Sequence, residues 1–231
     1  VACGVRSRRP DLHIFVATGD GDCCAIGTAH WIHATRYNMN MTVLMFDNNT
    51  YGLTKMQTSP TTQKGHFSNT HPRGAILSPL QPLSVMLGIT NVSFIAQTVD
   101  WNPAHVLSTI RAAHKHQGFS FIRILQRCPH YTPEVFDPMQ RDPSLLLFLE
   151  HEQGIGVPDA VANMYPNKLH HDPTDLAAAR AVAGIEDKYP IGLLYQNKDA
   201  ERYDVMSAEG VGMSAKDRIA AAQTAIDRFL V

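Results

Sequence analysis

Residues 13–47 constrain the fold most, because they follow the order typical of a βαβ unit. Residues 13–18 (HIFVAT) predict a strand, and residues 42–46 (TVLMF) predict a second strand whose continuous apolar run indicates burial on both faces. Between them, residues 25–37 predict a helix. Such units favour a parallel sheet with right-handed crossovers. The residues at helical spacing on one face of this helix are Ile26, Ala29, His30, His33 and Ala34.

The following residues repeat this alternation. Residues 82–87 and 103–116 predict helices, and residues 93–99 (SFIAQTV) and 120–125 (SFIRIL) predict strands. Residues 48–74 are rich in Asn, Thr, Ser, Pro and Gly and too long for an idle connection, so we expect a functional loop there. We therefore predict a doubly wound α/β fold with a mostly parallel sheet.

The pattern changes after Cys128. We divide the chain into an α/β domain at 1–128 and an irregular C-terminal extension at 129–231 that contacts the domain or a partner subunit. Because the sequence opens on Val1 in mid-pattern, we expect an N-terminal segment to precede it. The elements expected in the extension are an apolar island at 145–149, a helix at 173–182, a strand at 191–195 and a helix at 214–230.

Composition excludes some partners. The formal net charge is −1, so we expect no attraction to nucleic acid. No apolar run reaches the ~20 residues that span a bilayer, so we expect no membrane segment. The four cysteines form neither a C-x-x-C pair nor a disulfide framework, which favours the cytoplasm.

Oxygen-bearing side chains follow the two strands of the βαβ unit. Asp20 lies in GDGD at 19–22, and Asn48 lies in DNN at 47–49. Open α/β sheets bind ligands at the carboxyl ends of their strands. A diphosphate needs a divalent cation to hold it, and Mg²⁺ takes oxygen ligands, with one or two from side chains. The candidate Mg²⁺ ligands are the Asp20 carboxylate, the Asn48 amide oxygen and the backbone carbonyl of Thr50.

The glycines of the turn bring the backbone close to a phosphate. Gly19 and Gly21 have no Cβ, and the helix that follows directs its first N–H groups at the same place. We expect Asp22 to orient the turn or cap the helix, since one carboxylate already supplies the cation site.

The residues from 19 to 62 resemble one family. GDG, the intervening length and NN resemble the thiamine diphosphate signature, and YGLTK, Gln57 and SPT extend the likeness to the β subunits of 2-oxoacid:ferredoxin oxidoreductases. The likeness continues through residues 71–72, 79–88 and 118–128.

The resemblance implies roles for individual residues. Asp20, Asn48 and the Thr50 carbonyl hold Mg²⁺ and the diphosphate, and Thr54 to Thr61 belong to the loop over the active site. The family's Asn-Asn pair aligns with Asp47-Asn48 or with Asn48-Asn49. We prefer Asn48 as the ligand, because it keeps the family's spacing from Asp20. The residues implied to bind the cofactor are Gly19, Asp20, Gly21, Asp22, Asn48, Thr50, Tyr51, Gly52, Leu53 and Thr54.

A cysteine at the place of Cys128 is, by the resemblance, one ligand of a [4Fe–4S] cluster. Such clusters need four thiolates as a rule, and the family's N-terminal cysteine motif is absent here. Either a preceding segment carries the other ligands, which is the alternative we favour, or this protein lacks the cluster. Without the resemblance, Cys128 is more simply a buried structural thiol.

No general acid or base is assigned, because in this family the activating carboxylate is supplied by the α subunit. His33 is a candidate for a supporting role beside the cofactor helix, although a packed histidine is the simpler interpretation. Lys55 could steer a substrate carboxylate, and an ordinary loop lysine explains it nearly as well.

The resemblance implies an enzyme that converts a 2-oxoacid and coenzyme A to acyl-CoA and CO₂ and passes electrons through the cluster to ferredoxin. The loop GLTK-x-Q-x-SPT favours 2-oxoglutarate over pyruvate or a branched-chain 2-oxoacid. The alternatives are a non-oxidative thiamine diphosphate decarboxylase or carboligase and a non-catalytic assembly subunit. We expect an α subunit as partner and a dimer of αβ units.

Overall fold

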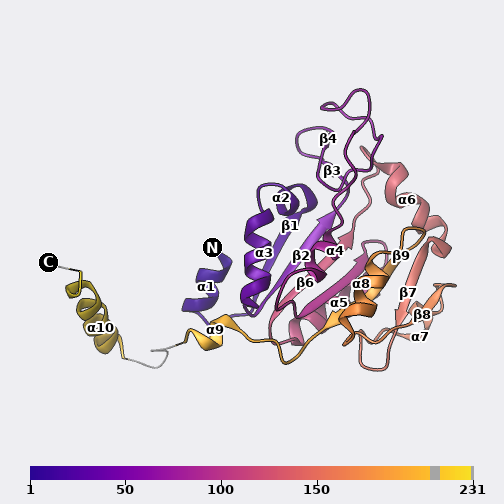
Figure 1. The fold of residues 1–231 in the computed structure, drawn as a ribbon. Helices are drawn as coiled ribbons and strands as arrows, with labels where there is room; N and C mark the ends of the chain where they lie inside the picture. The colour runs from indigo at the N-terminus through magenta and orange to yellow at the C-terminus, as the bar shows by residue number, and fades with distance from the viewer. Residues whose placement is uncertain (209–213, 230–231) are drawn as a thin grey trace.

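A seven-stranded sheet forms the centre of the computed structural model, which describes residues 1–208 and 214–229. The strands lie in the order β1-β2-β6-β5-β9-β7-β8 (Figure 1). Their bounds in that order are Ile14–Gly19, Met41–Asp47, Phe119–Leu125, Phe94–Val99, Tyr189–Gln196, Leu146–Glu150 and Lys168–His170.

The sheet has two parallel halves that run in opposite directions. Strands β1, β2, β6 and β5 are parallel to one another, and β9, β7 and β8 are parallel to one another. The two halves meet where β5 pairs antiparallel with β9. The carboxyl ends of the first four strands therefore lie at one edge of the sheet. The prediction of a mostly parallel α/β sheet is confirmed.

Helices α3 (Thr28–Tyr37), α4 (Pro82–Leu87) and α8 (Leu176–Ala183) share one core with the sheet. Trp31 of α3 stacks on Phe121 of β6 with ring centroids 5.4 Å apart. This corrects the helix face expected from the sequence, since Trp31 and Thr35 are the buried residues of α3 while His30 and His33 are exposed. Ile26, also expected on that face, is 92% exposed and precedes α3.

Helix α5 (Pro103–Lys115) forms a separate cluster with β5 and β6. Its Asn102 N-cap accepts from the amide of His105, and its first residue is a proline, which suits a helix start. A third cluster joins β7 and β9 to α6 (Pro133–Arg141) and α7 (Asp159–Ala162).

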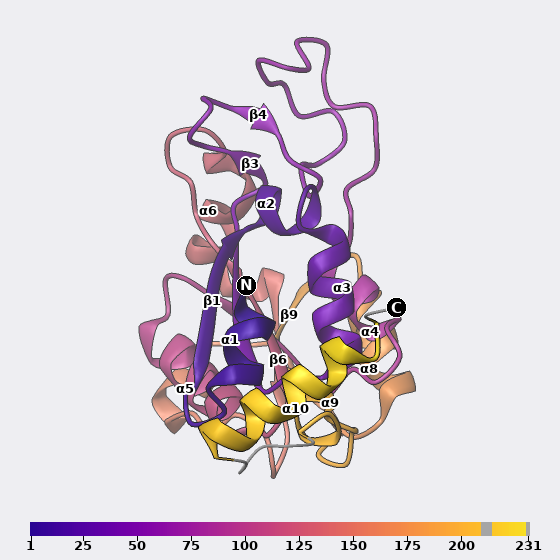
Figure 2. The same cartoon turned by 90° about the vertical axis from the view of Figure 1, so that its left-hand side faces the viewer.

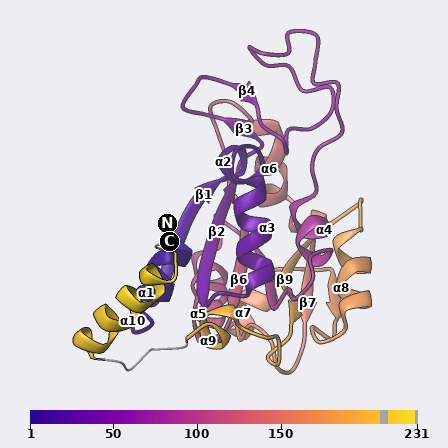
Figure 3. The same cartoon turned by 60° about the vertical axis from the view of Figure 1, so that its left-hand side comes forward.

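The segment between β2 and α4 extends beyond the sheet. It holds only the short pair β3 (Thr50–Tyr51) and β4 (Gln57–Thr58), as expected for a loop, and Figures 1 and 3 show it above β1, β2 and α2. The GDGD turn differs from expectation, because the short helix α2 (Asp20–Cys24) begins within it. The helical conformation is then interrupted at residues 25–27, before α3 begins.

The C-terminal part is more regular than expected. The helix near 173–182 and the strand near 191–195 are found as α8 and β9, whereas α6 and β8 were not predicted. The remaining elements are α1 (Ala2–Arg8), the 3-10 turn η1 (Pro143–Leu145), α9 (Tyr203–Met206) and α10 (Ala215–Asp227). The expected end of the last helix at 230 lies outside the described residues. Figure 2 shows α10 at the end of the molecule away from β3 and β4.

No helix in the described part of the chain is long and apolar enough to cross a membrane.

Candidate functional site

Asp20 is the first residue of α2 and lies directly after β1. Its side chain is buried, with the residue 2% exposed. One carboxylate oxygen, Oδ2, accepts hydrogen bonds from the hydroxyls of Ser59 and Thr61, each at 2.6 Å. These hydroxyls belong to the long loop, so the loop closes over the end of β1 and fixes the carboxylate.

The pKa of Asp20 is raised to about 6. Burial is the largest cause, and the charge of Asp47 adds to it. The hydroxyls of Ser59 and Thr61 and the backbone amide of Asn48 oppose the shift, because they stabilise the carboxylate form. A cation held against this carboxylate would lower its pKa in the same way, by favouring the charged form.

Asp47 ends β2 and is fully buried beside Asp20. Its Oδ2 accepts from Nε and Nη2 of Arg123 at 2.7 and 2.6 Å. Its Oδ1 accepts from the Thr61 hydroxyl at 3.0 Å and from the amide of Asn49 at 3.2 Å. Removing one partner of such a buried ion pair costs about 3–5 kcal/mol of folding free energy. This pair was not predicted from the sequence, where its signal is the single charged residue in the apolar run SFIRIL.

The two asparagines that follow Asp47 have different surroundings. Asn48 is half-buried, and its Oδ1 accepts only a long bond from the Thr50 amide at 3.3 Å. Asn49 is 1% exposed with φ of 60°, and its Nδ2 donates to the carbonyl of Thr61 at 2.8 Å. The Oδ1 atom of Asn49 has no partner within the described part of the protein. In both alignments that the sequence left open, an asparagine therefore places an amide oxygen after the end of β2.

Tyr51 lies against the glycine turn. Its hydroxyl donates to the carbonyl of Gly21 at 2.9 Å, and a Cβ on Gly21 would lie 2.2 Å from the Tyr51 ring. Gly52 is half-buried, and a Cβ there would lie 4.0 Å from the Tyr131 ring, whereas Leu53 is 99% exposed and Thr54 is exposed. The structure thus brings Tyr51 to the turn and leaves Leu53 and Thr54 exposed.

Gly19 is the extended N-cap residue of α2. Asp22 is exposed in the first turn of α2 and makes no side-chain cap bond there. The carbonyl of Asp22 accepts a hydrogen bond from the amide of Gly27, which stabilises the turn between α2 and α3.

Cys128 is half-buried in the segment that follows β6. Its carbonyl accepts from the amide of Thr132 at 3.1 Å, and the Thr132 hydroxyl donates to the carbonyl of Asn48 at 2.9 Å. A short chain of bonds therefore joins the cysteine loop to the loop that carries Asn48.

Two other candidates lie outside this cluster. His33 is exposed on α3, with its ring against Tyr37 at 6.2 Å between centroids. Lys55 is exposed in the β3–β4 turn with φ of 64°. Neither side chain makes a described bond to Asp20 or Asn48.

A cavity of about 670 Å³ opens beside this cluster. Ser59 and Tyr51 line it, together with the exposed apolar side chains Ile76 and Leu77, which are 73% and 77% exposed. Apolar walls with a few polar groups at one end are typical of a cofactor site.

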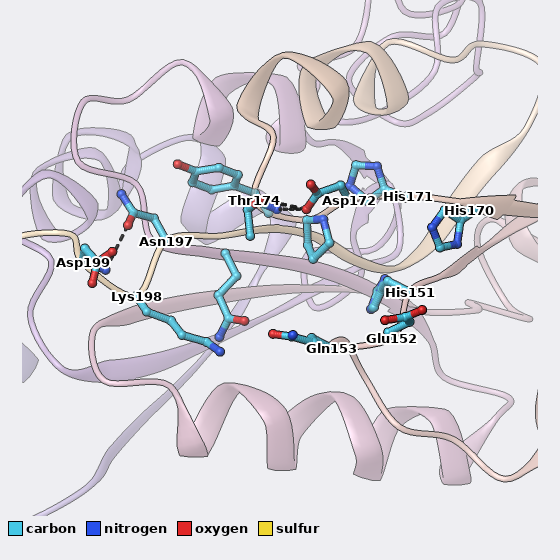
Figure 4. Close-up of a pocket in the computed structure, with 13 residues that line it drawn as sticks. His151, Glu152, Gln153, His170, His171, Asp172, Thr174, Asn197, Lys198 and Asp199 are labelled. Atoms are coloured by element: carbon cyan, nitrogen blue, oxygen red, sulfur yellow. Dashed lines mark hydrogen bonds between the residues drawn. The ribbon is translucent and has the colours of Figure 1, made fainter.

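A second cavity, of about 820 Å³, lies at the carboxyl ends of β7, β8 and β9 (Figure 4). Two of the polar side chains that line it are bonded within the protein. His171 donates to the carbonyl of Leu194 at 2.6 Å, and Asp172 accepts from the amide of Thr174 at 2.9 Å. Asp20, which follows β1, lies at the opposite edge of the sheet.

Within the described ranges, no three His, Cys, Asp or Glu side chains group as metal ligands. A site built from Asp20, one asparagine oxygen and a backbone carbonyl contains only one such residue. The donors are all oxygen, as Mg²⁺ requires, and a diphosphate and water would complete the coordination. The buried Asp20 carboxylate fits a bound cation, and an amide oxygen follows β2 in either register, from Asn48 or from Asn49.

Comparison with known proteins agrees with this geometry. The family described as thiamine pyrophosphate enzyme, C-terminal TPP binding domain, matches residues 1–124. The family that describes the C-terminal part of the pyruvate ferredoxin oxidoreductase beta subunit matches residues 161–209. The fold and the site thus define a thiamine diphosphate-binding domain.

Individual relatives narrow the class. The chain is 39% identical to 2-oxoglutarate oxidoreductase subunit KorB of Mycobacterium tuberculosis over 62% of this chain and 38% of that protein. It is 31% identical to 2-oxoacid:ferredoxin oxidoreductase subunit beta of a Sulfolobus species over 88% of this chain and 64% of that one. The solved 2-oxoglutarate:ferredoxin oxidoreductase from Magnetococcus marinus, with 2-oxoglutarate, coenzyme A and succinyl-CoA bound, superposes with a TM-score of 0.77 and 32% identity. That match covers 96% of this chain and 71% of the other.

The chain belongs to the β subunits of the 2-oxoacid:ferredoxin oxidoreductases. The resemblance found in the sequence is confirmed. The chain spans between about a third and two thirds of the curated relatives described above.

Proposed function

We propose that this chain is the thiamine diphosphate-binding subunit of an enzyme that oxidatively decarboxylates a 2-oxoacid and transfers the acyl group to coenzyme A. The observation that carries the proposal is the buried Asp20 carboxylate, held by Ser59 and Thr61 next to the end of β2. Bound thiamine diphosphate supplies the chemistry that lets CO₂ leave the 2-oxoacid.

The protein's own residues hold and orient the cofactor. Asp20, Asn48 and the carbonyl of Thr50 ligate Mg²⁺, and the backbone at Gly19 and Gly21 approaches the diphosphate. Tyr51 fixes the turn through its bond to Gly21. Asp22, Gly52, Leu53 and Thr54 line the edge of the site. Lys55 and His33 have supporting roles at most, because both side chains are exposed.

Cys128 would be one ligand of a [4Fe–4S] cluster, which would supply one-electron transfer to ferredoxin as the acceptor. The bonds from Thr132 to the carbonyls of Cys128 and Asn48 support this proposal, since they tie the cysteine loop to the cofactor loop. The other three ligands are supplied from elsewhere in the complete enzyme.

The open side of the site lies against an α subunit. Large apolar side chains are exposed around it, and such patches are typical of a protein interface. They are Ile26, Leu53, Phe67, Ile76 and Leu77. Residues 129–231 provide further contact with the α subunit, and two αβ units form the complete enzyme.

The favoured substrate is 2-oxoglutarate, because relatives named for it share 38–39% of aligned residues with this chain. The test uses the full-length chain, purified anaerobically with its co-encoded α subunit. Reduction of a viologen dye is followed with coenzyme A and either 2-oxoglutarate or pyruvate. We expect reduction that depends on coenzyme A, is faster with 2-oxoglutarate and is lost in Asp20→Ala.

Dye reduction at equal rates in wild type and Asp20→Ala would reject the assigned site. Decarboxylation of the 2-oxoacid without reduction of the dye would instead identify a non-oxidative decarboxylase or carboligase.

A further inference from the structure

The buried pair of Asp47 and Arg123 has no role in the proposed function so far. Arg123 lies in the middle of β6 and is 6% exposed, and Asp47 is fully buried. A charged pair so deep in a sheet carries a large desolvation penalty, which its own attraction often fails to offset. Its position one hydroxyl away from Asp20 points to a purpose other than stability.

The connection runs through Thr61. The single hydroxyl proton of Thr61 faces two carboxylates, because its oxygen lies 2.6 Å from Asp20 Oδ2 and 3.0 Å from Asp47 Oδ1. One proton can be donated to only one of them at a time. Arg123 gives Asp47 two charged donors of its own. The Thr61 proton is thereby left for Asp20.

A second hydrogen bond, made by the Arg123 nitrogen that does not contact Asp47, fixes the orientation of the guanidinium. Its Nη1 donates to Oε1 of Gln97 at 3.2 Å, and Gln97 Nε2 donates to the carbonyl of Pro190 at 2.6 Å. Gln97 is fully buried on the neighbouring strand β5. The guanidinium therefore cannot swing away from Asp47 without breaking this second contact.

Arg123 also offsets the negative charge of Asp47. A diphosphate brings negative charge to a place that already holds Asp20 and Asp47. An uncompensated Asp47 would repel it strongly, because the surroundings are buried. Asp47 also begins the turn that carries Asn48, so its position sets the position of that residue.

We propose that Arg123 is a positioning residue for the cofactor site. It neutralises Asp47, releases the Thr61 hydroxyl to Asp20 and keeps the negative charge of the site low enough for Mg²⁺ and a diphosphate to bind. This inference rests on the proposed function, because it assumes that thiamine diphosphate is the ligand.

The test measures binding and not turnover. The full-length chain with its α subunit is freed of cofactor with a chelator, and thiamine diphosphate with MgCl₂ is titrated by calorimetry. Arg123→Met should raise Kd by about 10–100-fold, the range for groups that support a metal ligand. Asp47→Asn should leave Kd within about three-fold of wild type, because it removes the negative charge that Arg123 otherwise neutralises and keeps an oxygen that can accept from the Asn49 amide. The double variant should recover the binding lost in Arg123→Met.

The matched control is Arg6→Met. Arg6 forms a similarly buried ion pair with Asp204, with Nε 2.8 Å from Oδ2, and lies outside the cofactor site. It should lower the urea midpoint and leave Kd unchanged. Absence of binding in wild type would reject the proposed function itself. Equal Kd in wild type and Arg123→Met, or equal loss in Arg123→Met and Asp47→Asn, would overturn the role of Arg123 alone.

Discussion

The hydroxyl of Tyr51 donates to the backbone carbonyl of Gly21, and the Tyr51 ring occupies the space that a side chain at Gly21 would need. Gly21 lies in α2, which follows β1, and Tyr51 lies in β3, which follows β2. Their contact therefore sets the distance between the segments that follow these two strands.

Gly21→Ala should therefore displace Tyr51, because the new Cβ would lie 2.2 Å from a ring carbon. A shift of about 1 Å in such a site can cost about 100-fold in rate. Dye reduction by the complete enzyme measures this loss. The control is Gly156→Ala, since a Cβ there meets nothing within 4 Å. Full activity in Gly21→Ala would contradict the close packing described here.

The two candidate asparagines can be separated by substitution. Asn48→Ala should raise the Mg²⁺ concentration needed for cofactor binding at least about ten-fold, because it removes an oxygen ligand. Asn49→Ala should mainly lower stability, since it removes the bond to the Thr61 carbonyl and places alanine at a positive φ. The urea midpoint and the Mg²⁺ titration together distinguish them. The reverse pattern would assign the ligand to Asn49.

Two buried histidines predict a pH dependence of stability. Burial lowers the pKa of His105 and of His116 to about 4, and the charges of Arg202 and Lys198 contribute at His116. Below pH ~6.5 the unfolded chain binds protons that the folded chain does not, until pH ~4. The free energy of unfolding should therefore fall on acidification across this window, by about 1.4 kcal/mol per pH unit for each histidine.

Urea unfolding between pH 4 and 7 measures this effect. Asp20 acts in the opposite direction, because its raised pKa favours the protonated folded state. The difference between wild type and His116→Gln isolates the histidine, with the exposed His30→Gln as control. A difference that does not change with pH would contradict a neutral buried His116.

Cys128 gives a prediction about iron. In the full-length enzyme purified anaerobically, Cys128→Ser should lose the iron bound by this chain, because a [4Fe–4S] cluster needs its thiolates. The buried Cys24→Ser is the control, since the Cys24 thiol lies 3.7 Å from the sulfur of Met45 and faces the core. Unchanged iron content in Cys128→Ser would remove this residue from the cluster.

Sequence periodicity predicted most elements before residue 128, because their strands are apolar runs and their helices have proline or polar starts. It did not predict the buried face of α3. His33 was interpreted as a packed residue, whereas the buried residues of this helix are Trp31 and Thr35. It also missed α6, which contains Pro138 inside the helix, a residue that normally breaks one.

The site was predictable only in part. Asp20 and Asn48 follow their strands in sequence, so their meeting at one edge could be deduced from a parallel sheet. The contacts of Ser59 and Thr61 with Asp20 span 39 and 41 residues, and the pair of Asp47 and Arg123 spans 76. Local patterns carry no information on which distant polar groups will be paired.

We expect Asp20 to bind the Mg²⁺ that holds thiamine diphosphate. Calorimetric titration of thiamine diphosphate into the cofactor-free αβ complex, with and without MgCl₂, tests it most directly in wild type and Asp20→Asn. Asparagine fills the same volume and can still accept from Ser59. We predict Mg²⁺-dependent binding in wild type and a loss of at least about 100-fold in Asp20→Asn, since even groups that only support a metal ligand are worth about 10–100-fold. Equal affinity in both proteins, or binding that is indifferent to Mg²⁺, would contradict the account.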